Sequence, residues 1–358
     1  MSASSRALAL AVVMSIAVAV PVSAKPGDII VGDSAADTVV RVKPRTGAVR
    51  LISNDSRLVD PNDVAIGRDG TLYVADYGAF PAGNDGAVFA INPRNGNTRV
   101  VSDDELFERP DGIALGPDGD LYVSNLDGPL LRVRLPGGAT SIASEDPLAV
   151  GSVGVVVPPD GLPLVGDFEL IARVDLATGA AATVSDSTNG LEAGYGLALG
   201  TDGTIYTVES AAGLEAVNPR SGAVDDLSGP VSYGGYGIAR DLRGRVLIQN
   251  TGEITTVNPR NGAIAPVASA GLNYPEGMEV EPPRCQGLTA TIVGTHRRDV
   301  LKGSRFGDVI AGIGGRDKIR GKGGRDVICG GDGPDRISGG AGKDRCKGQA
   351  GRDRERGC

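Results

Sequence analysis

The sequence has no tryptophan and a single histidine among its 358 residues, with eight tyrosines and five phenylalanines. Histidine is the side chain that most often moves protons near neutral pH. Because His296 lies in the last quarter of the chain, no Ser-His-Asp or Cys-His arrangement can be assembled in the preceding part. The shortage of aromatic residues also disfavours a sugar-binding surface built on tryptophan stacking.

Long hydrophobic runs are missing except at the start, where Arg6 precedes the apolar stretch Ala7 to Val20 and Val22-Ser23-Ala24 follows it. A charged start, an apolar middle and a small-residue end predict a secretory signal peptide over residues 1–24. The alternative is an uncleaved anchor, although the run is short for a membrane span. We therefore expect a secreted, extracellular protein that begins at Lys25 and has no transmembrane span.

Cysteine is absent before Cys285, and the other three are Cys329, Cys346 and Cys358, without the C-x-x-C spacing of zinc sites. An even number of cysteines in an exported chain predicts two disulfides, for which three pairings are possible. We expect Cys346 with Cys358, because that bond would clasp the end of the chain, which leaves Cys285 with Cys329. A buried free thiol at Cys346 is the alternative.

Charge is also distributed unevenly. From Cys285 onward there are 16 Lys and Arg against 9 Asp and Glu, a net charge of +7 in a chain whose total is −8. The preceding part is therefore strongly acidic. Two regions of opposite sign predict two domains, and neither shows a pattern that favours nucleic-acid binding.

One unit, PNDVAIGRDGTLYVADY at Pro61 to Tyr77, recurs through the acidic part as two apolar strands joined at an Asp-Gly turn. Its copies align on Asp63, Gly112, Gly154, Gly196, Gly237 and Gly277, with spacings of 49, 42, 42, 41 and 40. A second signature, of the form NPRNG, follows five of these copies and predicts two more strands around a hairpin. A period of about 40 residues with four short strands indicates a β-propeller blade.

The blade count predicts how the ring closes. The sixth copy, at Gly277, has no later strands to complete its blade, whereas Asp28–Asp33, Thr38–Lys43 and Ala48–Ile52 form a set that lacks a first strand. The simplest solution is an all-β, six-bladed propeller over residues 25–282, closed by pairing the N- and C-terminal strands.

One face of the ring should collect polar and aromatic side chains, because the start of each first strand and the end of its antiparallel second strand emerge together. The first-strand starts are Asn62, Asp111, Val153, Tyr195, Tyr236 and Glu276, and the second-strand ends include Asp33, Asp76, Asp167 and Glu209. We expect Tyr195, Tyr236 and these four carboxylates to face a small molecule, a peptide or an envelope polymer. The alternative is that such Asp residues only cap turns.

The blocks PNDVAIGRDGTLYVAD and PDGIALGPDGDLYVSN resemble blades of the NHL and SMP-30/gluconolactonase-like propellers, a group that includes streptogramin lyases. The resemblance implies one divalent ion in the channel, held by Glu276, Asn62 and Asp111 from the PEG, PND and PDG loops. Three blades depart from the pattern, and the histidines on which streptogramin lyases depend are missing.

After a linker over residues 283–293, the period falls to nine, in rows such as GIGGRDKIR and GKGGRDVIC. The sixth column is Asp299, Asp308, Asp317, Asp326, Asp335, Asp344 and Asp353, and the eighth is Leu301, Ile310, Ile319, Ile328, Ile337, Cys346 and Glu355. Residues 294–358 resemble the RTX, or haemolysin-type, calcium-binding repeats.

The RTX resemblance implies a parallel β-roll in which carboxylates two rows apart, such as Asp308 and Asp326, share Ca²⁺. Several Ca²⁺ ions are expected, chiefly at Asp308 through Asp344, and less so at Asp299 and Asp353. Basic residues occupy the fifth column in five rows, and they either face anionic surface polymers or are merely solvated. The roll should fold only when it binds metal.

We therefore predict a secreted, monomeric calcium-binding protein with a propeller binding platform and a calcium-folded roll. The first alternative is a metal-dependent, lactonase-like hydrolase with one divalent ion at the propeller channel. The second is a structural protein of the cell envelope. An enzyme is the less favoured of these classes, because the channel lacks histidine.

Overall fold

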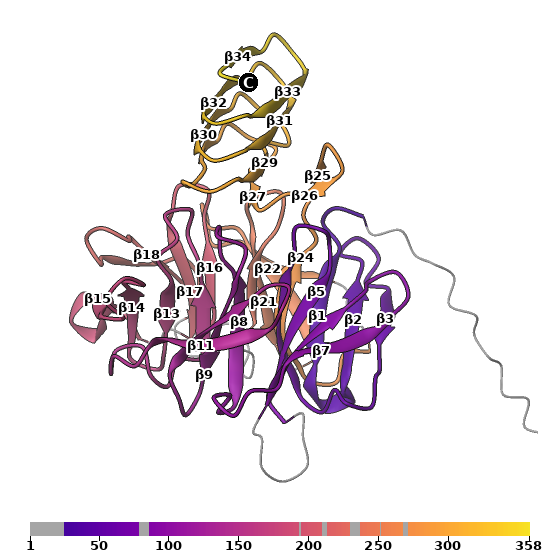
Figure 1. The fold of residues 1–358 in the computed structure, drawn as a ribbon, viewed down its shortest axis with the longest axis vertical. Coiled ribbons are helices and arrows are strands. Elements are labelled where there is room, and N and C mark those ends of the chain that lie inside the picture. Colours follow the sequence, from indigo (N-terminus) through magenta and orange to yellow (C-terminus); the bar gives the residue numbers. More distant parts are fainter. Residues whose placement is uncertain are drawn as a thin grey trace, which may run out of the picture.

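The computed structural model describes residues 25–78, 86–192, 195–209, 213–229, 237–250, 252–267 and 271–358. These residues form six four-stranded sheets arranged in a ring, with a parallel solenoid standing on one side of it (Figure 1). The two short 3-10 helices are η1 (Ser34–Ala36) and η2 (Ser187–Asn189). No helix among the described residues is long and apolar enough to cross a membrane. The predicted fold class is confirmed.

Five blades each use four consecutive antiparallel strands. They are β4 (Pro61–Ile66), β5 (Leu72–Asp76), β6 (Ala87–Ile91) and β7 (Thr98–Ser102); β8 (Pro110–Leu115), β9 (Leu121–Asn125), β10 (Leu130–Arg134) and β11 (Ala139–Ser144); β12 (Gly154–Val156), β13 (Leu164–Gly166), β14 (Leu170–Val174) and β15 (Ala181–Asp186); β16 (Leu197–Leu199), β17 (Ile205–Glu209), β18 (Gly213–Val217) and β19 (Val224–Asp226); and β20 (Ile238–Arg240), β21 (Val246–Asn250), β22 (Glu253–Val257) and β23 (Ile264–Val267).

The sixth blade is built from both ends of the propeller, in the order β24 (Pro275–Val280), β1 (Ile29–Asp33), β2 (Thr38–Val42) and β3 (Val49–Ser53). Strands β24 and β1 are antiparallel, with Val31 opposite Met278. The predicted closure is confirmed, and it leaves no inner strand of the ring without a partner in its own blade.

In five blades a glycine of the first strand lets the backbones of neighbouring blades approach closely at the centre of the ring. A Cβ on Gly237 would overlap the carbonyl oxygen of Glu276 in the neighbouring blade. Blade β4–β7 has Asp63 at this register position, and its Oδ2 accepts a hydrogen bond from the backbone N–H of Ile113, 3.0 Å away in the next blade. The centre of the ring is therefore held by tight backbone packing and by this one carboxylate link.

The core of the propeller lies between blades rather than within them. One cluster joins Ile29 and Val31 of β1 to Leu247 of β21 and Ile254 of β22, and Met278 of β24 completes it. Such clusters recur around the ring, so each blade buries both faces against its neighbours. This burial stabilises the ring.

The C-terminal solenoid has two parallel sheets. One contains β27 (Ile292–Val293), β29 (Val309–Ala311), β31 (Val327–Asp332) and β33 (Arg345–Ala350), and the other contains β28 (Val300–Lys302), β30 (Lys318–Gly323), β32 (Arg336–Ala341) and β34 (Arg354–Arg356). Register pairs are 18 residues apart, as in Ile310 with Ile328. Five residues of the predicted inward column are buried between the sheets. They are Leu301, Ile310, Ile319, Ile328 and Ile337.

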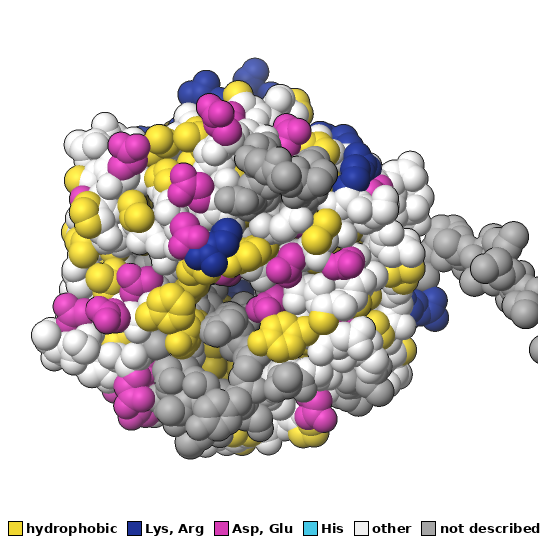
Figure 2. All heavy atoms as spheres, turned by 90° about the horizontal axis from the view of Figure 1, so that it is seen from below, with side chains coloured by type: hydrophobic (Ala, Val, Ile, Leu, Met, Phe, Trp, Pro, Cys, Tyr) yellow, Lys and Arg dark blue, Asp and Glu magenta, His cyan; other side chains and the backbone are white. Residues whose placement is uncertain are grey.

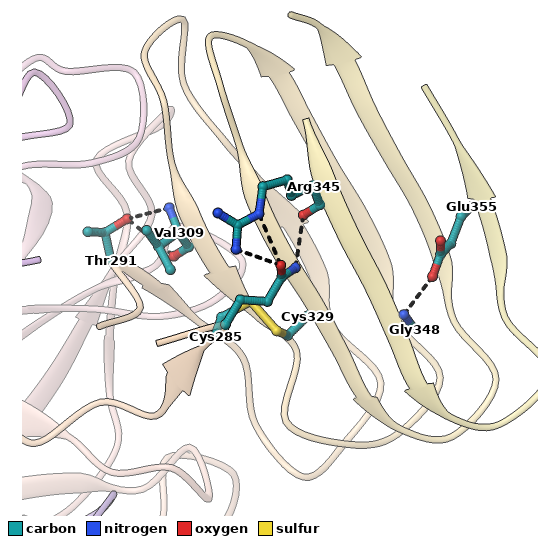
Figure 3. Close-up of a disulfide and its surroundings, with 8 residues drawn as sticks. Cys285, Thr291, Val309, Cys329, Arg345, Gly348 and Glu355 are labelled. Carbon is teal, nitrogen blue, oxygen red and sulfur yellow. Dashed lines mark hydrogen bonds between the residues drawn. A yellow bond between two sulfur atoms is a disulfide. The ribbon is translucent and has the colours of Figure 1, made fainter. Parts of the chain in front are cut away.

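The segment before the roll is not extended. Strands β25 (Arg284–Cys285) and β26 (Leu288–Thr289) form a hairpin that packs on the outside of sheet β27-β29-β31-β33. Cys285 is bonded to Cys329 of β31, and the Gln286 side chain accepts two hydrogen bonds from the guanidinium of Arg345 (Figure 3). The second disulfide joins Cys346 and Cys358, so the predicted pairing is confirmed.

The roll stands on the turns that join the first and second strands of the blades. The backbone N–H of Thr289 donates to the carbonyl of Arg68 at 3.0 Å, and the Arg240 guanidinium donates to the carbonyl of Val293 at 2.6 Å. The face with the strand starts that line the channel therefore points away from the roll. Figure 2 views the molecule from that side, where acidic side chains surround a central hollow.

Candidate metal centre

The aspartates of the roll are stacked along its axis. In each pair two rows apart, the backbone N–H of the earlier Asp donates to Oδ1 of the later one. The distances are 2.9 Å for Asp299 to Asp317, 2.8 Å for Asp308 to Asp326, 2.8 Å for Asp317 to Asp335, 2.9 Å for Asp326 to Asp344 and 2.9 Å for Asp335 to Asp353. This backbone contact brings the carboxylates of alternate rows together.

The second oxygen of the central carboxylates has no such partner. Oδ2 of Asp317, Asp326, Asp335 and Asp344 is buried and accepts no hydrogen bond from the described residues. A Cβ on Gly330 would collide with Asp335 Oδ2 and with the carbonyl oxygen of Gly348, so these two oxygens converge on the space left by the glycine. Carboxylate and carbonyl oxygens are the ligands that Ca²⁺ prefers.

Backbone carbonyls are needed for such a site. No three His, Cys, Asp or Glu side chains of the described residues cluster closely enough to hold a metal by themselves. The glycine that begins each central row leaves space in which a backbone carbonyl oxygen lies next to the carboxylate oxygen that has no hydrogen-bond partner. The residues of the central rows therefore fit Ca²⁺.

Burial makes these carboxylates costly to ionise without a cation. Desolvation raises the pKa of Asp317 to about 7, and the neighbouring carboxylates of Asp335 and Asp299 contribute to the rise. Desolvation likewise raises the pKa of Asp326 to about 6. A bound cation would favour the ionised forms and remove this penalty.

The propeller has a separate acidic site at the centre of the face opposite the roll. Asn62, Asp111 and Glu276 line one cavity of about 40 Å³, together with apolar residues such as Val153 and Leu197 from the remaining blades. This volume is enough for a few water molecules. The three predicted channel residues are thus brought together.

The carboxyls in this cavity are poorly solvated. Burial raises the pKa of Glu276 to about 8 and that of Asp63 to about 7. The pKa of Asp111 is also well above its ordinary value, first because of burial and then because Glu276 and Asp63 are close. No ion pair of the described residues involves these three groups.

Two family models match separate parts of the chain. The model of the SMP-30/gluconolactonase/LRE-like region matches residues 4–129, and the model of the RTX calcium-binding nonapeptide repeat matches residues 293–328 and 325–355. The chain joins an SMP-30/gluconolactonase/LRE-like region to RTX calcium-binding repeats. The comparison with curated proteins found no match.

Among solved structures, a chain of a nidogen/laminin complex is similar, with a TM-score of 0.60. The two sequences are 14% identical, and the match covers 72% of this chain and 99% of that chain. At this identity the likeness shows the fold alone.

The first two RTX rows differ from the central ones. Oδ2 of Asp299 accepts hydrogen bonds from the backbone N–H of Thr295 at 2.6 Å and from its hydroxyl at 2.9 Å, while Oδ1 accepts one from Thr201 of the propeller at 3.0 Å. In the next row, Oδ2 of Asp308 accepts from Ser304 in the same way. The signal was present in the sequence, because the second column holds a hydroxyl residue in these two rows, Thr295 and Ser304, and none in the central rows.

The aspartates at the ends of the second strands brace loops. Asp33 accepts hydrogen bonds from the backbone N–H groups of Asn273 and Tyr274, both at 2.9 Å. Asp76 accepts from the N–H groups of residues 59 and 60, and Asp167 from those of residues 169 and 170. These contacts agree with the turn-capping alternative, and a ligand-binding role for the three residues stays a prediction.

The rim of the mouth contains residues that the repeat pattern did not single out. Phe168 is 48% exposed and packs edge-on against Tyr195, with ring centroids 4.9 Å apart. Across the rim, Arg109 donates to the Tyr77 hydroxyl at 2.7 Å and forms an ion pair with Asp127. Tyr236 and the side chain of Glu209 lie outside the described residues.

Proposed function

We propose that this calcium-binding propeller protein is secreted, that its RTX roll folds by taking up several Ca²⁺ ions, and that its propeller mouth is a binding platform. The observation that carries the proposal is the row of buried carboxylate oxygens without hydrogen-bond partners in the central rows. They lie against glycine carbonyls, which supply the remaining oxygen ligands. Asp317, Asp326, Asp335 and Asp344 would hold the ions, with Asp308 contributing its free Oδ1.

The roll has little else to hold it together. Between its two sheets five rows each bury one apolar side chain, and hairpin β25–β26 covers only a small second cluster around Val309 and Val327, so the area buried per ordered residue is small. The stacked carboxylates oppose compaction while they carry charge. Metal-binding free energy would therefore supply most of the folding free energy of the roll.

Circular dichroism of residues 285–358 tests the folding half of this proposal. We expect β structure to appear as Ca²⁺ is added and to disappear with a chelator. The propeller, residues 25–283, is the control and should keep its spectrum throughout. Spectra of the roll that do not change across the titration would contradict the proposal.

Recovery from the culture medium of a chain beginning at Lys25 would test export.

A second candidate function is a lactonase-like hydrolase with one divalent ion in the channel. It is supported by the convergence of Asn62, Asp111 and Glu276 on one cavity whose carboxyls have no ion-pair partner among the described residues. These side chains would hold the ion, which would polarise the carbonyl of a lactone.

Metal analysis of the propeller without its tail, Lys25 to Pro283, separates the two functions, because the roll would otherwise mask a channel ion. The hydrolase predicts one divalent ion per chain that is lost in Glu276→Gln, together with lactone hydrolysis that falls in the same variant. A metal-free propeller that retains its fold would leave the platform as the supported function.

A further inference from the structure

The two sheets of the roll differ in what covers their outer faces. Sheet β27-β29-β31-β33 is covered by hairpin β25–β26, whose Cys285 packs on Val309 and Val327. The outer face of sheet β28-β30-β32-β34 is exposed (Figure 1). The residues that flank its inward column are Val300, Lys302, Lys318, Arg320, Arg336, Ser338, Arg354 and Arg356. Six of these eight are cations and none is acidic.

The cations form two straight rows across the strands, and we call the six of them the basic ladder. Lys318 lies opposite Arg336, which in turn lies opposite Arg354. In the second row, Lys302 lies opposite Arg320. Neighbouring strands are about 4.8 Å apart, so the first row repeats a positive charge at that interval on three successive strands. The second row continues from Arg320 to Ser338 and Arg356, so one uncharged residue interrupts it.

This arrangement is unfavourable in isolation. Like charges directly opposite one another on neighbouring strands destabilise a sheet. Within the part of the chain that the structure describes, no basic-ladder residue forms an ion pair, and none of its side chains donates a hydrogen bond. The sheet therefore presents an unneutralised positive surface whose energy a long anion would lower.

We propose that the basic ladder binds an extended acidic polysaccharide with one carboxylate on each sugar. Such a polymer repeats its charge on a length close to the strand spacing of about 4.8 Å, so successive carboxylates can meet successive strands. The guanidinium groups of Arg320, Arg336 and Arg354 can each hold a carboxylate by two parallel hydrogen bonds. The polymer would run along the roll axis and relieve the repulsion within each row.

A nucleic acid fits this surface less well. Single strands are bound without sequence preference by combining basic grooves with aromatic side chains on which bases stack. The eight positions of this face include no aromatic residue. The face is also a flat sheet rather than a groove, so the carboxylate polymer is the better match.

The inference goes beyond the proposed function, because it concerns the roll rather than the propeller mouth. Only its calcium dependence rests on that function, since the rows come into register when the roll folds. Two measurements distinguish a failure of calcium-driven folding from a failure of polymer binding. Binding that persists after chelation would contradict calcium-driven folding and not the ladder, whereas a calcium-folded roll that does not bind the polymer would contradict the ladder alone.

Fluorescence anisotropy of a labelled galacturonan oligomer tests the proposal on the mature full chain, in Ca²⁺ excess over uronate. The fully methyl-esterified oligomer is the neutral control. The test variant carries Lys318→Gln, Arg320→Gln, Arg336→Gln and Arg354→Gln. The matched control removes four exposed cations of the turns, with Arg298→Gln, Arg316→Gln, Arg325→Gln and Lys343→Gln.

We expect the ladder variant to lose at least about tenfold in affinity, because four exposed ion pairs of ordinary strength are removed together. The turn variant should lose less than about threefold, and the methyl-esterified oligomer should not bind. The ladder variant should fold with Ca²⁺ at least as well as the parent, which circular dichroism checks, because like-charge repulsion is removed. A triple Arg→Lys variant at 320, 336 and 354 keeps the charge and should retain intermediate affinity.

Equal losses in the two quadruple variants would overturn the proposal, since binding would then follow net charge alone. A single-stranded oligonucleotide that binds more tightly than the galacturonan and is lost in the ladder variant would replace the polysaccharide by a nucleic acid. Concentration-dependent self-association that the ladder variant abolishes, without polymer binding, would assign the face to the acidic propeller of a second copy.

Discussion

The two halves of the molecule are both repeats of short strands, but they differ in how much each repeat can bury. A propeller repeat of about 40 residues makes a four-stranded sheet whose two faces pack on neighbouring blades. A roll repeat of nine residues makes one short strand with one inward side chain. The propeller can thus fold on apolar burial, whereas the roll needs another source of free energy.

Two buried aspartates of the propeller differ from the aspartates in the central rows of the roll. In the propeller, both oxygens of Asp33 accept backbone hydrogen bonds, and so do both oxygens of Asp76. In the central rows of the roll, only one oxygen of each Asp is satisfied. A buried polar atom without a partner is unfavourable, so its regular repetition points to a ligand that supplies the missing interaction.

Opening the ring should destabilise the molecule more than any other change. Deleting residues 25–53 removes β1, β2 and β3 and leaves β24 without its partner. The truncated chain would expose strand edges at the gap, and such edges promote aggregation. We expect it to be insoluble, as measured by the soluble fraction after expression and by light scattering.

The matched control for the ring is deletion of everything after Pro283. The roll contributes no strand to a blade, so this chain should stay soluble with an all-β spectrum. An unfolded propeller in this control would show that the ring needs the roll in order to fold. A soluble, cooperatively folded N-terminal deletion would show that the ring does not need its sixth blade.

The sequence predicted the folds because each repeats with a regular period. The alignment on Asp63 and the five glycines specified six blades, and the unmatched first strand at Gly277 specified the closure. The nonapeptide columns specified which residue of each row points inward. In both cases, one register fixes many residues at once.

Contacts between repeats were harder to predict. Asp63 links two blades, and Arg109 joins Tyr77 to Asp127 at the rim, but the repeat pattern says nothing about pairs that occur once. Hairpin β25–β26 lies in a segment without a repeat, so its cover over one sheet of the roll could not be read from any period. The unpaired carboxylate oxygens of the roll could be found only in the structure. A sequence pattern shows where a carboxylate lies, but not whether its oxygens accept hydrogen bonds.

The second largest effect should come from the clasp at the end of the roll. Cys358→Ser removes the bond to Cys346, which spans 12 residues. The loop-entropy model gives up to about 3 kcal/mol for a loop of this size. We expect a lower thermal midpoint of the roll in Ca²⁺ and faster amide exchange in β33, with the propeller transition unchanged.

Cys285→Ala is the comparison variant for the clasp, because it removes the other disulfide, at the hairpin. It should loosen β25 and β31 rather than β33. Peptide mapping that links Cys329 to Cys346, or unchanged exchange in β33 of Cys358→Ser, would contradict the clasp.

A smaller effect is expected from single aspartates of the roll. Asp326→Asn removes the charge of a carboxylate whose own Oδ2 has no hydrogen-bond partner, and it should weaken Ca²⁺ binding by at least about tenfold, or 1.4 kcal/mol. Asp299→Asn should change Ca²⁺ affinity little, because both of its oxygens already accept hydrogen bonds from Thr295 and Thr201.

Calorimetric titration of the full chain with Ca²⁺ measures both variants against the parent. Asp299→Asn should instead loosen the junction, which faster amide exchange at Thr201 and Thr295 would report. Equal losses of affinity in the two variants would show that the first row binds calcium like the central rows and would remove the distinction between them.

The last effect concerns pH and the propeller alone. Burial raises the pKa of Asp76 to about 7, and hydrogen bonds from the backbone N–H groups of Val59 and Asp60 only partly oppose this. In the unfolded chain the same group has a pKa near about 4. Between these values the folded state holds a proton that the unfolded state has released. The stability from this group is therefore complete below about pH 4 and is lost as the pH rises through about 7.

Urea unfolding of the tail-deleted propeller should accordingly give a free energy of unfolding that falls between pH 5 and pH 8. Asp76→Asn should show a flatter pH dependence, because an amide does not titrate in this range. Glu145→Gln is the control, since Glu145 is exposed and should leave the slope unchanged. A propeller whose stability rises over this range would show that its buried carboxylates are held ionised by their hydrogen bonds, which would contradict the raised pKa of Asp76.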